Sequence, residues 1–387
     1  MIVWLALLAV AEPLDLDTVL REAGLAGPRI RATKAEERVA AERARLAGSW
    51  RPLEASTMIE SLDGPMLTAR LGVPLDAFQR RGPEAKVAAA EERAAQVRTS
   101  QVAWEVQNQA AELFLELWMS WQMNELIQRQ VDVLNRLRAS ALAQYASGAS
   151  MGHHDVLRAE SEIAELEATM TNLSDERHGI WAELSTILGR APSEPPDTAT
   201  PVARPLPEVS APDRAGPPEI EMLERMTDAA SARVELEERM TWPMPMVGAF
   251  YEYGFESAMH SVGAELSVAI PLTSEADEAR ADVEVMKQRV ALARETANAE
   301  LTVARRRAVA KDRALRVLER DVVPRLREAL ASSEAAYSSG TGSFVVLLED
   351  ALALLRREEA LIRARAEREL AILEVLRRTR KGEFWRN

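Results

Sequence analysis

Two long stretches of the chain contain almost none of the residues, glycine and proline, that end helices. The first, residues 84–147, contains no glycine or proline and lies between Pro83 and Gly148, which are helix start and stop signals. The second, residues 274–339, is interrupted only by Pro324. At a rise of about 1.5 Å per residue, the first helix would be roughly 96 Å long. Helices of this length predict extended rods rather than a compact domain.

Four shorter segments alternate between apolar and polar residues at every second position, which predicts β-strands with two different faces. Residues 53–62 and 66–75 are joined by the turn Asp63-Gly64-Pro65, and a second pair spans 247–255 and 261–272. The clearest apolar faces consist of Leu67, Ala69, Leu71, Val73 and Leu75 in the first pair, and of Val262, Ala264, Leu266, Val268, Ile270 and Leu272 in the second. Each pair is predicted to form a β-hairpin.

The same order of elements occurs twice, which indicates an internal duplication. The matching landmarks, about 190 residues apart, are Trp50-Arg51-Pro52 with Trp242-Pro243, Gly72-Val73-Pro74-Leu75 with Ala269-Ile270-Pro271-Leu272, and Tyr145-Ala146-Ser147-Gly148 with Tyr337-Ser338-Ser339-Gly340. Each half reads as helix, β-hairpin, long helix, turn and return helix. We therefore predict a first repeat at 12–191, an extended proline-rich linker at 192–218 and a second repeat at 219–387.

Composition narrows the class of protein. Aromatic residues make up 5% and charged residues 28% of the 387 residues, a profile typical of long helices and coiled coils. The net charge of −13 argues against a nucleic-acid partner, because binding phosphates requires surplus lysine and arginine. The chain contains no cysteine, so disulfides, thiolate chemistry and a lipid anchor on an N-terminal cysteine are excluded.

The N-terminus predicts export. Residues 1–11 are apolar and end in Ala9-Val10-Ala11, a cleavage pattern that indicates a signal peptide, although no lysine or arginine precedes the apolar run. A buried N-terminal segment is the alternative. No other run approaches the roughly 20 apolar residues of a membrane-spanning helix, so a membrane would have to be crossed by strands.

The predicted strands have about the length of tilted transmembrane strands. One hairpin cannot satisfy its edges in lipid, but several copies of the chain could close a shared barrel with the polar face inside. The residues that would face its lumen are Glu60, Arg70, Glu252 and Glu265. A sheet packed on a helix of the same protein would show the same alternation. The barrel is favoured because no helix is left free to cover the sheet.

Several motifs carry a resemblance to a known family. Tyr337-Ser338-Ser339-Gly340-Thr341 with Ser343 is similar to a Tyr-x-x-Gly-x-x-Ser/Thr turn, and Leu347-Leu348-Glu349 lies where Val-Leu-Asp is usual. Tyr145, Gly148 and Asp155-Val156-Leu157 repeat the signature in the first half. In these motifs and in their duplicated order, the chain resembles the TolC-type outer-membrane factors, the exit ducts of efflux pumps and type I secretion systems.

The resemblance implies a mainly α fold with a small β part, in which two long-helix coiled-coil hairpins and two β-hairpins assemble as a homotrimeric α/β-barrel duct. It implies an outer-membrane location with a helical tunnel in the periplasm, passive conduction of exported solutes, and no cofactor. The implied partners are outer-membrane lipid, a periplasmic adaptor (membrane fusion) protein and an inner-membrane transporter.

The resemblance also assigns roles to residues. Tyr145, Gly148, Tyr337, Gly340 and Ser343 would form the periplasmic tip where the adaptor docks. Gly148 and Gly340 would allow tight turns through positive φ, and the two tyrosines would pack just inside them. Acidic residues often narrow the tunnel in this family. Here Val346 occupies the first such position and Glu349 keeps the second as the tunnel constriction, which implies a weakened preference for cations.

No catalytic arrangement emerges, since the chain has no cysteine, no G-x-S-x-G and no glycine-rich phosphate loop. His153-His154 lacks a third ligand and is interpreted as a solvated turn rather than a metal site. The fourteen methionines are interpreted as packing along helix seams. The alternative function is a periplasmic coiled-coil scaffolding protein that has the same fold without an open pore.

Overall fold

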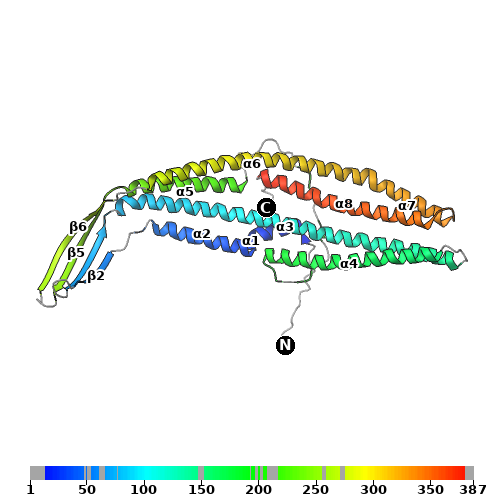
Figure 1. Cartoon of the computed structure of the whole chain (residues 1–387), viewed down its shortest axis with the longest axis horizontal. Helices are drawn as coiled ribbons and strands as arrows, with labels where there is room; N and C mark the ends of the chain where they lie inside the picture. Colours follow the sequence, from blue (N-terminus) through cyan, green and yellow to red (C-terminus); the bar gives the residue numbers. More distant parts are fainter. Residues whose placement is uncertain are drawn as a thin grey trace, which may run out of the picture. The chain divides into compact units, whose positions relative to one another are not determined.

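The computed structural model describes residues 14–47, 49, 54–60, 66–75, 77–146, 152–191, 193–196, 199–200, 204–206, 217–254, 259–270 and 275–379. Helices dominate this part of the chain, and they accompany a small antiparallel sheet (Figure 1). The predicted mainly α fold with a small β part is therefore confirmed. The predicted signal peptide at 1–11, the turn Asp63-Gly64-Pro65 and Gly148 lie outside the described residues.

The chain divides into two compact units, each built from both halves of the sequence. One unit comprises residues 1–31, 103–215 and 297–387, and the other comprises residues 32–102 and 216–296. We refer to them as the helical unit and the sheet unit. Within the described part of the chain, no helix is long and apolar enough to cross a membrane.

The sheet unit contains four antiparallel strands in the order β2-β3-β5-β6 (Figure 1). Their bounds are Glu54–Glu60, Met66–Pro74, Met244–Gly254 and Met259–Ala269. Both predicted hairpins are present as β2–β3 and β5–β6. The structure adds a pairing that the sequence did not predict, because β3 of the first half bonds to β5 of the second, with Met66 opposite Gly254.

Helices continue directly from this sheet. Helix α3 (Ala77–Ala146) follows β3, and α6 (Ala276–Val317) follows β6. The predicted start of α3 after Pro83 is wrong, since Pro83 lies inside the helix. Proline removes a single backbone donor, and the helix loses only one hydrogen bond near its beginning. In the sheet unit, α2 (Pro28–Ala47) and α5 (Pro218–Met240) complete the helices.

The helical unit contains α1 (Leu16–Ala26) and two return helices, α4 (Gly152–Leu188) and α8 (Phe344–Thr379). The second rod continues from α6 through a π-helical turn, η1 (Leu318–Val322), into α7 (Val323–Ser338). The largest fully buried side chains include Phe114, Leu115 and Leu117 of α3, and Leu347 and Leu348 of α8. Both predicted rods and both return helices are thus present.

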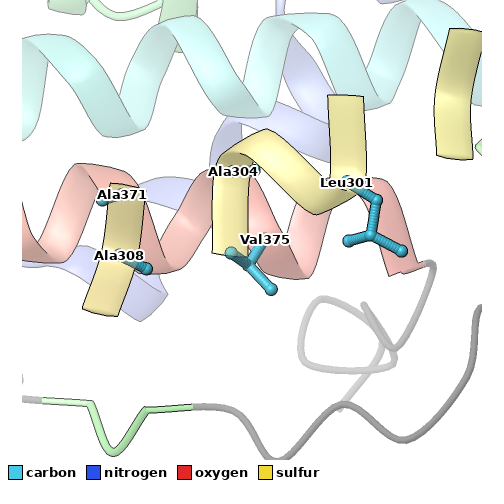
Figure 2. Close-up of a cluster of buried hydrophobic side chains, with 5 residues drawn as sticks. All are labelled: Leu301, Ala304, Ala308, Ala371 and Val375. Carbon is cyan, nitrogen blue, oxygen red and sulfur yellow. The ribbon is translucent and has the colours of Figure 1, made fainter. Parts of the chain in front are cut away.

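Small side chains bring α6 and α8 close together. Leu301, Ala304 and Ala308 of α6 form a buried cluster with Ala371 and Val375 of α8, and Leu206 packs against this cluster. Figure 2 shows the five residues of the cluster on the two neighbouring helices. Because alanine has no side-chain conformational entropy to lose, this narrow seam is inexpensive to order.

The described linker residues between 193 and 206 contain no helix and are docked on the helical unit, whereas Pro218, the last residue of the predicted linker, already begins α5. Strand β4 (Ala199–Thr200) pairs in parallel with β1 (Leu14–Asp15). Arg204 is buried, and its Nη2 donates to Oδ1 of Asp17 at 2.7 Å while its backbone N–H donates to Oε2 of Glu369 at 3.3 Å. The linker therefore joins α1 of the first repeat to α8 of the second.

Candidate functional site

The sheet leaves one apolar face uncovered. Thr57, Ala69, Tyr251 and Val262 lie opposite one another across its four strands. The exposed fraction reaches 72% for Ile59, 79% for Val262 and 71% for Leu266 on this face. A continuous exposed apolar patch of this kind marks an interaction surface, since water solvates it poorly.

The opposite face carries the predicted lumen residues. Arg70, Glu252 and Glu265 share this face by strand register, and Nε of Arg70 lies 3.8 Å from Oε2 of Glu265. Of Glu60, the structure describes only the backbone, which pairs with Met66. The structure thus brings three of the four predicted residues to one face, while their position in a lumen stays a prediction.

Glycine makes the Arg70–Glu265 ion pair possible. Glu265 pairs with Gly248 of β5, and Gly248 pairs with Gly72 of β3, so this row carries no side chain between Glu265 and β3. Arg70 reaches Glu265 diagonally from the next row, in which its direct partner is Phe250. Gly248 is also restricted by its neighbours, because a Cβ there would lie 3.1 Å from the carbonyl oxygen of Leu71. The glycines therefore shape a polar surface on which two half-exposed charges can meet.

Four methionines also lie on the polar face, a feature that was not predicted from the sequence. Met58, Met66, Met246 and Met259 alternate with the apolar face and lie on the same side as Arg70. The exposed fraction is 53% for Met58 and 69% for Met259. The interpretation of the methionines as helix packing is wrong for these four. For Met58 and Met66, their positions in the alternating segments were the signal that could have shown it, whereas Met246 and Met259 lie just outside those segments. Flexible thioether side chains adapt to apolar groups of many shapes.

The turn between α7 and α8 depends on two glycines. Gly340 has a φ of 77°, and its N–H donates to the carbonyl of Tyr337 at 3.0 Å. The N–H of Gly342 donates to the carbonyl of Ala336 at 2.8 Å, and a Cβ at Gly342 would lie 2.7 Å from the backbone nitrogen of Tyr337. The sequence predicted the conformation of Gly340 but missed the close approach at Gly342.

Ser343 begins the return helix. Its Oγ accepts a hydrogen bond from the N–H of Val345 at 3.3 Å, which satisfies one of the backbone donors left free at a helix start. Ser343 thus has a structural role in the turn whether or not a partner binds there.

Tyr337 packs inside the turn, as expected. Its ring lies edge-on to that of Phe344, with 5.7 Å between the ring centroids and 62° between the planes. Burial raises the pKa of Tyr337, and the carboxylate of Asp155 in α4 raises this pKa further. Within the described part of the chain, the buried hydroxyl of Tyr337 has no hydrogen-bond partner. The residue therefore stays neutral at physiological pH.

Tyr145 does not pack in the same way, so the expectation of two equivalent tyrosines is wrong. Its exposed fraction is 50%, and its ring lies against that of His153 at 5.5 Å between centroids. The first turn has the polar His153 where the second has the buried Phe344, which removes the apolar partner that holds Tyr337 inside. Gly148 of the first turn lies outside the described residues.

Glu349 and Val346 lie one turn apart on the exposed side of α8. Their orientation is fixed by Leu347 and Leu348, which are fully buried between them. The side chains of Glu349 and Val346 therefore point away from the core of the chain and toward whatever lies beside it. Their place at a tunnel constriction stays a prediction.

His153 and His154 are exposed. Among the described residues, no group of three histidine, aspartate or glutamate side chains could hold a metal ion. The candidate surfaces are the packed turns of the helical unit and, separately, the two faces of the sheet in the sheet unit.

No sequence model of a protein family matches this chain, and no curated protein matches it. Solved structures do. The alignment covers 94% of this chain in each of three cases. The outer-membrane protein VceC of Vibrio cholerae is 19% identical, is covered over 96% of its length and has a TM-score of 0.72. The outer-membrane channel MtrE of Neisseria gonorrhoeae, in its open state, is 16% identical, is covered over 88% and has a TM-score of 0.73. The outer-membrane channel CmeC of Campylobacter jejuni is 10% identical, is covered over 84% and has a TM-score of 0.76. At these identities the likeness is one of fold. The resemblance to the TolC-type outer-membrane factors is confirmed at that level.

Proposed function

We propose that three copies of this chain form a passive duct across the outer membrane, through which solutes leave the periplasm. The observation that carries the proposal is the sheet, which combines an exposed apolar face, a polar face with an ion pair, and two free edges. Lipid would cover the apolar face, and the polar face would line the lumen.

The strand order supports a shared barrel. Because β2, β3, β5 and β6 alternate in direction, β6 of one copy can pair with β2 of the next in the antiparallel sense. Closing the ring in this way satisfies every edge, as the interior of a bilayer requires. Strands β5 and β6 contain 11 residues each, which suits a tilted strand that spans a bilayer.

The lumen would be adaptable but net negative, because the four predicted lumen residues are three glutamates and one arginine. In each copy the ion pair between Arg70 and Glu265 cancels one charge of each sign, and the four methionines of the polar face add apolar, flexible surface. Such a lining offers a hydrated path that favours cations over anions, because rings of carboxylates attract positive charge. Transport would depend on geometry, with no chemical step.

In this proposal, the turns at the tip of the helical unit form the surface that binds a partner protein. Tyr145, Gly148, Tyr337, Gly340 and Ser343 would meet a periplasmic adaptor protein, which would link the duct to an inner-membrane transporter. Glu349, exposed on α8, would stand at the tunnel constriction. A periplasmic scaffold with the same fold is the competing function, and it would need a protein partner to cover the apolar face.

Matched lysine substitutions on neighbouring residues of β6 test the proposal. Leu266→Lys places a charge on the apolar face, and lysine facing the middle of a bilayer costs about 2–4 kcal/mol, so recovery from the outer membrane should fall several-fold. Ser267→Lys, on the polar face, should insert normally and change the single-channel conductance in planar bilayers. Equal recovery of both variants as water-soluble protein, without conductance, would favour the scaffold.

A further inference from the structure

One row of buried residues along the second rod recurs every seven residues, with one exception. Leu301, Ala308 and Leu315 form one run, and Val323, Leu330 and Tyr337 form the next. Between Leu315 and Val323 the step is eight residues instead of seven. A parallel row of buried and half-buried residues makes the same change between Leu318 and Leu326, and its members are Ala304, Lys311, Leu318, Leu326 and Ser333. The rod therefore contains one residue more than its packing repeat requires.

The π-helical turn η1 lies where the extra residue falls. In an unbroken α-helix, one additional residue would rotate everything beyond it by about 100°, and Leu330 and Tyr337 would leave the seam with α8. Instead, the N–H of Val323 donates to the carbonyl of Leu318, five residues back. The wider turn absorbs the residue and restores the register.

Proline weakens the same place. Pro324 lies two residues beyond the end of η1. It has no N–H to donate to the carbonyl of Arg320, and its ring crowds that carbonyl in a regular helix. Two adjacent features, a wide turn and a missing hydrogen bond, therefore lower the resistance to bending at one point of the rod.

The packing beside η1 leaves room for movement. A cleft of about 290 Å³ adjoins the turn and is lined partly by Leu315, Glu319, Arg365 and Arg368. The connections to α8 at this level include an exposed ion pair, with Nη2 of Arg365 2.6 Å from Oε1 of Glu319, and a buried one, with Nε of Arg368 2.8 Å from Oδ1 of Asp312. The exposed pair, which joins η1 itself to α8, tolerates small shifts better than interlocked apolar side chains do.

We propose that η1 is the pivot about which α7 and the tip turn move relative to α6 when the duct opens. The proposal rests on the proposed function and adds the position of the moving joint. Because Tyr337 packs tightly on Phe344 across the turn, α7 and the start of α8 would move together as one body.

Two single-residue deletions, seven residues apart, test the pivot. Both Arg320 in η1 and Arg313 in α6 are exposed. Deleting Arg320 should restore an unbroken seven-residue repeat, so the trimer should form and melt at an equal or higher temperature. Deleting Arg313 would shorten the step from Ala308 to Leu315 and should prevent a stable trimer.

The functional readout is the opening frequency of single channels in planar bilayers. A straightened rod should open at least about ten times less often than the parent protein. A second readout uses spin labels on Arg313→Cys and Glu334→Cys, on either side of η1, whose distance distribution should become narrower after the deletion of Arg320.

Each outcome that differs from these expectations overturns either the pivot or the proposed function. Frequent openings and an unchanged distance distribution after deletion of Arg320 would overturn the pivot and leave the duct intact. Failure of this variant to form trimers, like the Arg313 deletion, would show that the extra residue is needed for folding and would also overturn it. A parent protein that never conducts would instead refute the proposed function.

Discussion

At the scale of single residues, the second tip turn offers a graded series of substitutions. Gly340→Ala would place a side chain at a φ of 77°, at a cost of about 1–2 kcal/mol. Gly342→Ala would push a Cβ to within 3 Å of backbone atoms of Ala336 and Tyr337, at about 1–3 kcal/mol. Thermal unfolding followed by circular dichroism should show a lower midpoint for both variants.

Gly179→Ala is the matched control for this series. Gly179 lies inside α4, and a Cβ there meets nothing within 4 Å. Alanine in a helix interior should therefore stabilise the protein by about 0.5–1 kcal/mol. An equal loss of stability in all three variants would contradict the close approach at Gly342.

Glu369 should make stability depend on pH. Burial raises its pKa above the usual 4.5, against the opposing hydrogen bond from Arg204 and the charge of Arg368. The folded state therefore binds this proton more tightly than the unfolded state, and the stability from this group is full below about pH 4.5 and is lost as the pH rises through the folded pKa. The melting temperature of Glu369→Gln minus that of the parent should increase between about pH 4 and pH 8.

The exposed Glu328 provides the control, since Glu328→Gln also removes one carboxylate from the helical unit. The melting temperature of Glu328→Gln minus that of the parent should change less over the same pH range. A flat difference for Glu369→Gln would mean that the buried carboxyl is ionised as easily in the folded protein as in the unfolded chain.

The structural roles of some single residues could be predicted from the sequence, and those of others could not. Gly340 and Ser343 could be assigned because a helix end imposes local rules on them. Gly342, the exposed Tyr145 and the methionines of the sheet could not be assigned with the same ease. Their environments depend on which neighbours the fold brings near, and Tyr145 differs from Tyr337 only because His153 stands in the place of Phe344.

At the scale of elements, the docked linker has a testable anchor. Arg204→Ala removes a buried guanidinium that binds Asp17, and hydrogen bonds between charged groups contribute about 1.5–3 kcal/mol. The melting temperature should fall, and limited proteolysis should cut faster between α4 and α5.

Arg190→Ala is the comparison for the linker variant. Arg190 also pairs with α1, through Glu22, but both side chains are 37% exposed. Exposed ion pairs contribute at most about 1 kcal/mol, so this variant should behave much like the parent. Equal sensitivity of the two variants to protease would argue against Arg204 as an anchor.

The elements themselves were largely predictable. The alternation of apolar and polar residues identified all four strands, because one face of the sheet is apolar and the other is polar. The pairing of β3 with β5 was not predictable, since alternation says nothing about which strand lies beside which. The extra residue at η1 was equally hidden, because the eight-residue step is visible only when the buried positions are known. Pro324 was the single local sign of it.

At the scale of the whole molecule, the proposed duct predicts that the free edges of the sheet join three copies in a trimer of three times 42.8 kDa. Strands β2 and β6 are three strand spacings apart within one chain, about 14 Å, which no disulfide can bridge. Thr57→Cys should therefore be combined in turn with Val262→Cys, Ala264→Cys and Leu266→Cys. One combination should give oxidised species up to a trimer and no larger on a non-reducing gel.

The parent chain has no cysteine, so each introduced pair reports alone. Ala69→Cys with Tyr251→Cys provides the control, because these residues lie opposite each other on β3 and β5 of one chain. This pair should cross-link within the monomer. Products limited to dimers, or no product from any β2–β6 combination, would contradict a closed ring of three copies.

The bond between β3 and β5 has a consequence for the order in which the protein is made. Met66 and Gly254 are 188 positions apart (254 − 66) and pair directly, so one edge of the first hairpin stays open until most of the chain has been synthesised. Contacts between such distant residues form slowly, and open strand edges invite aggregation in the meantime. An exported chain of this design would depend on periplasmic chaperones to shield its first hairpin until its second half arrives.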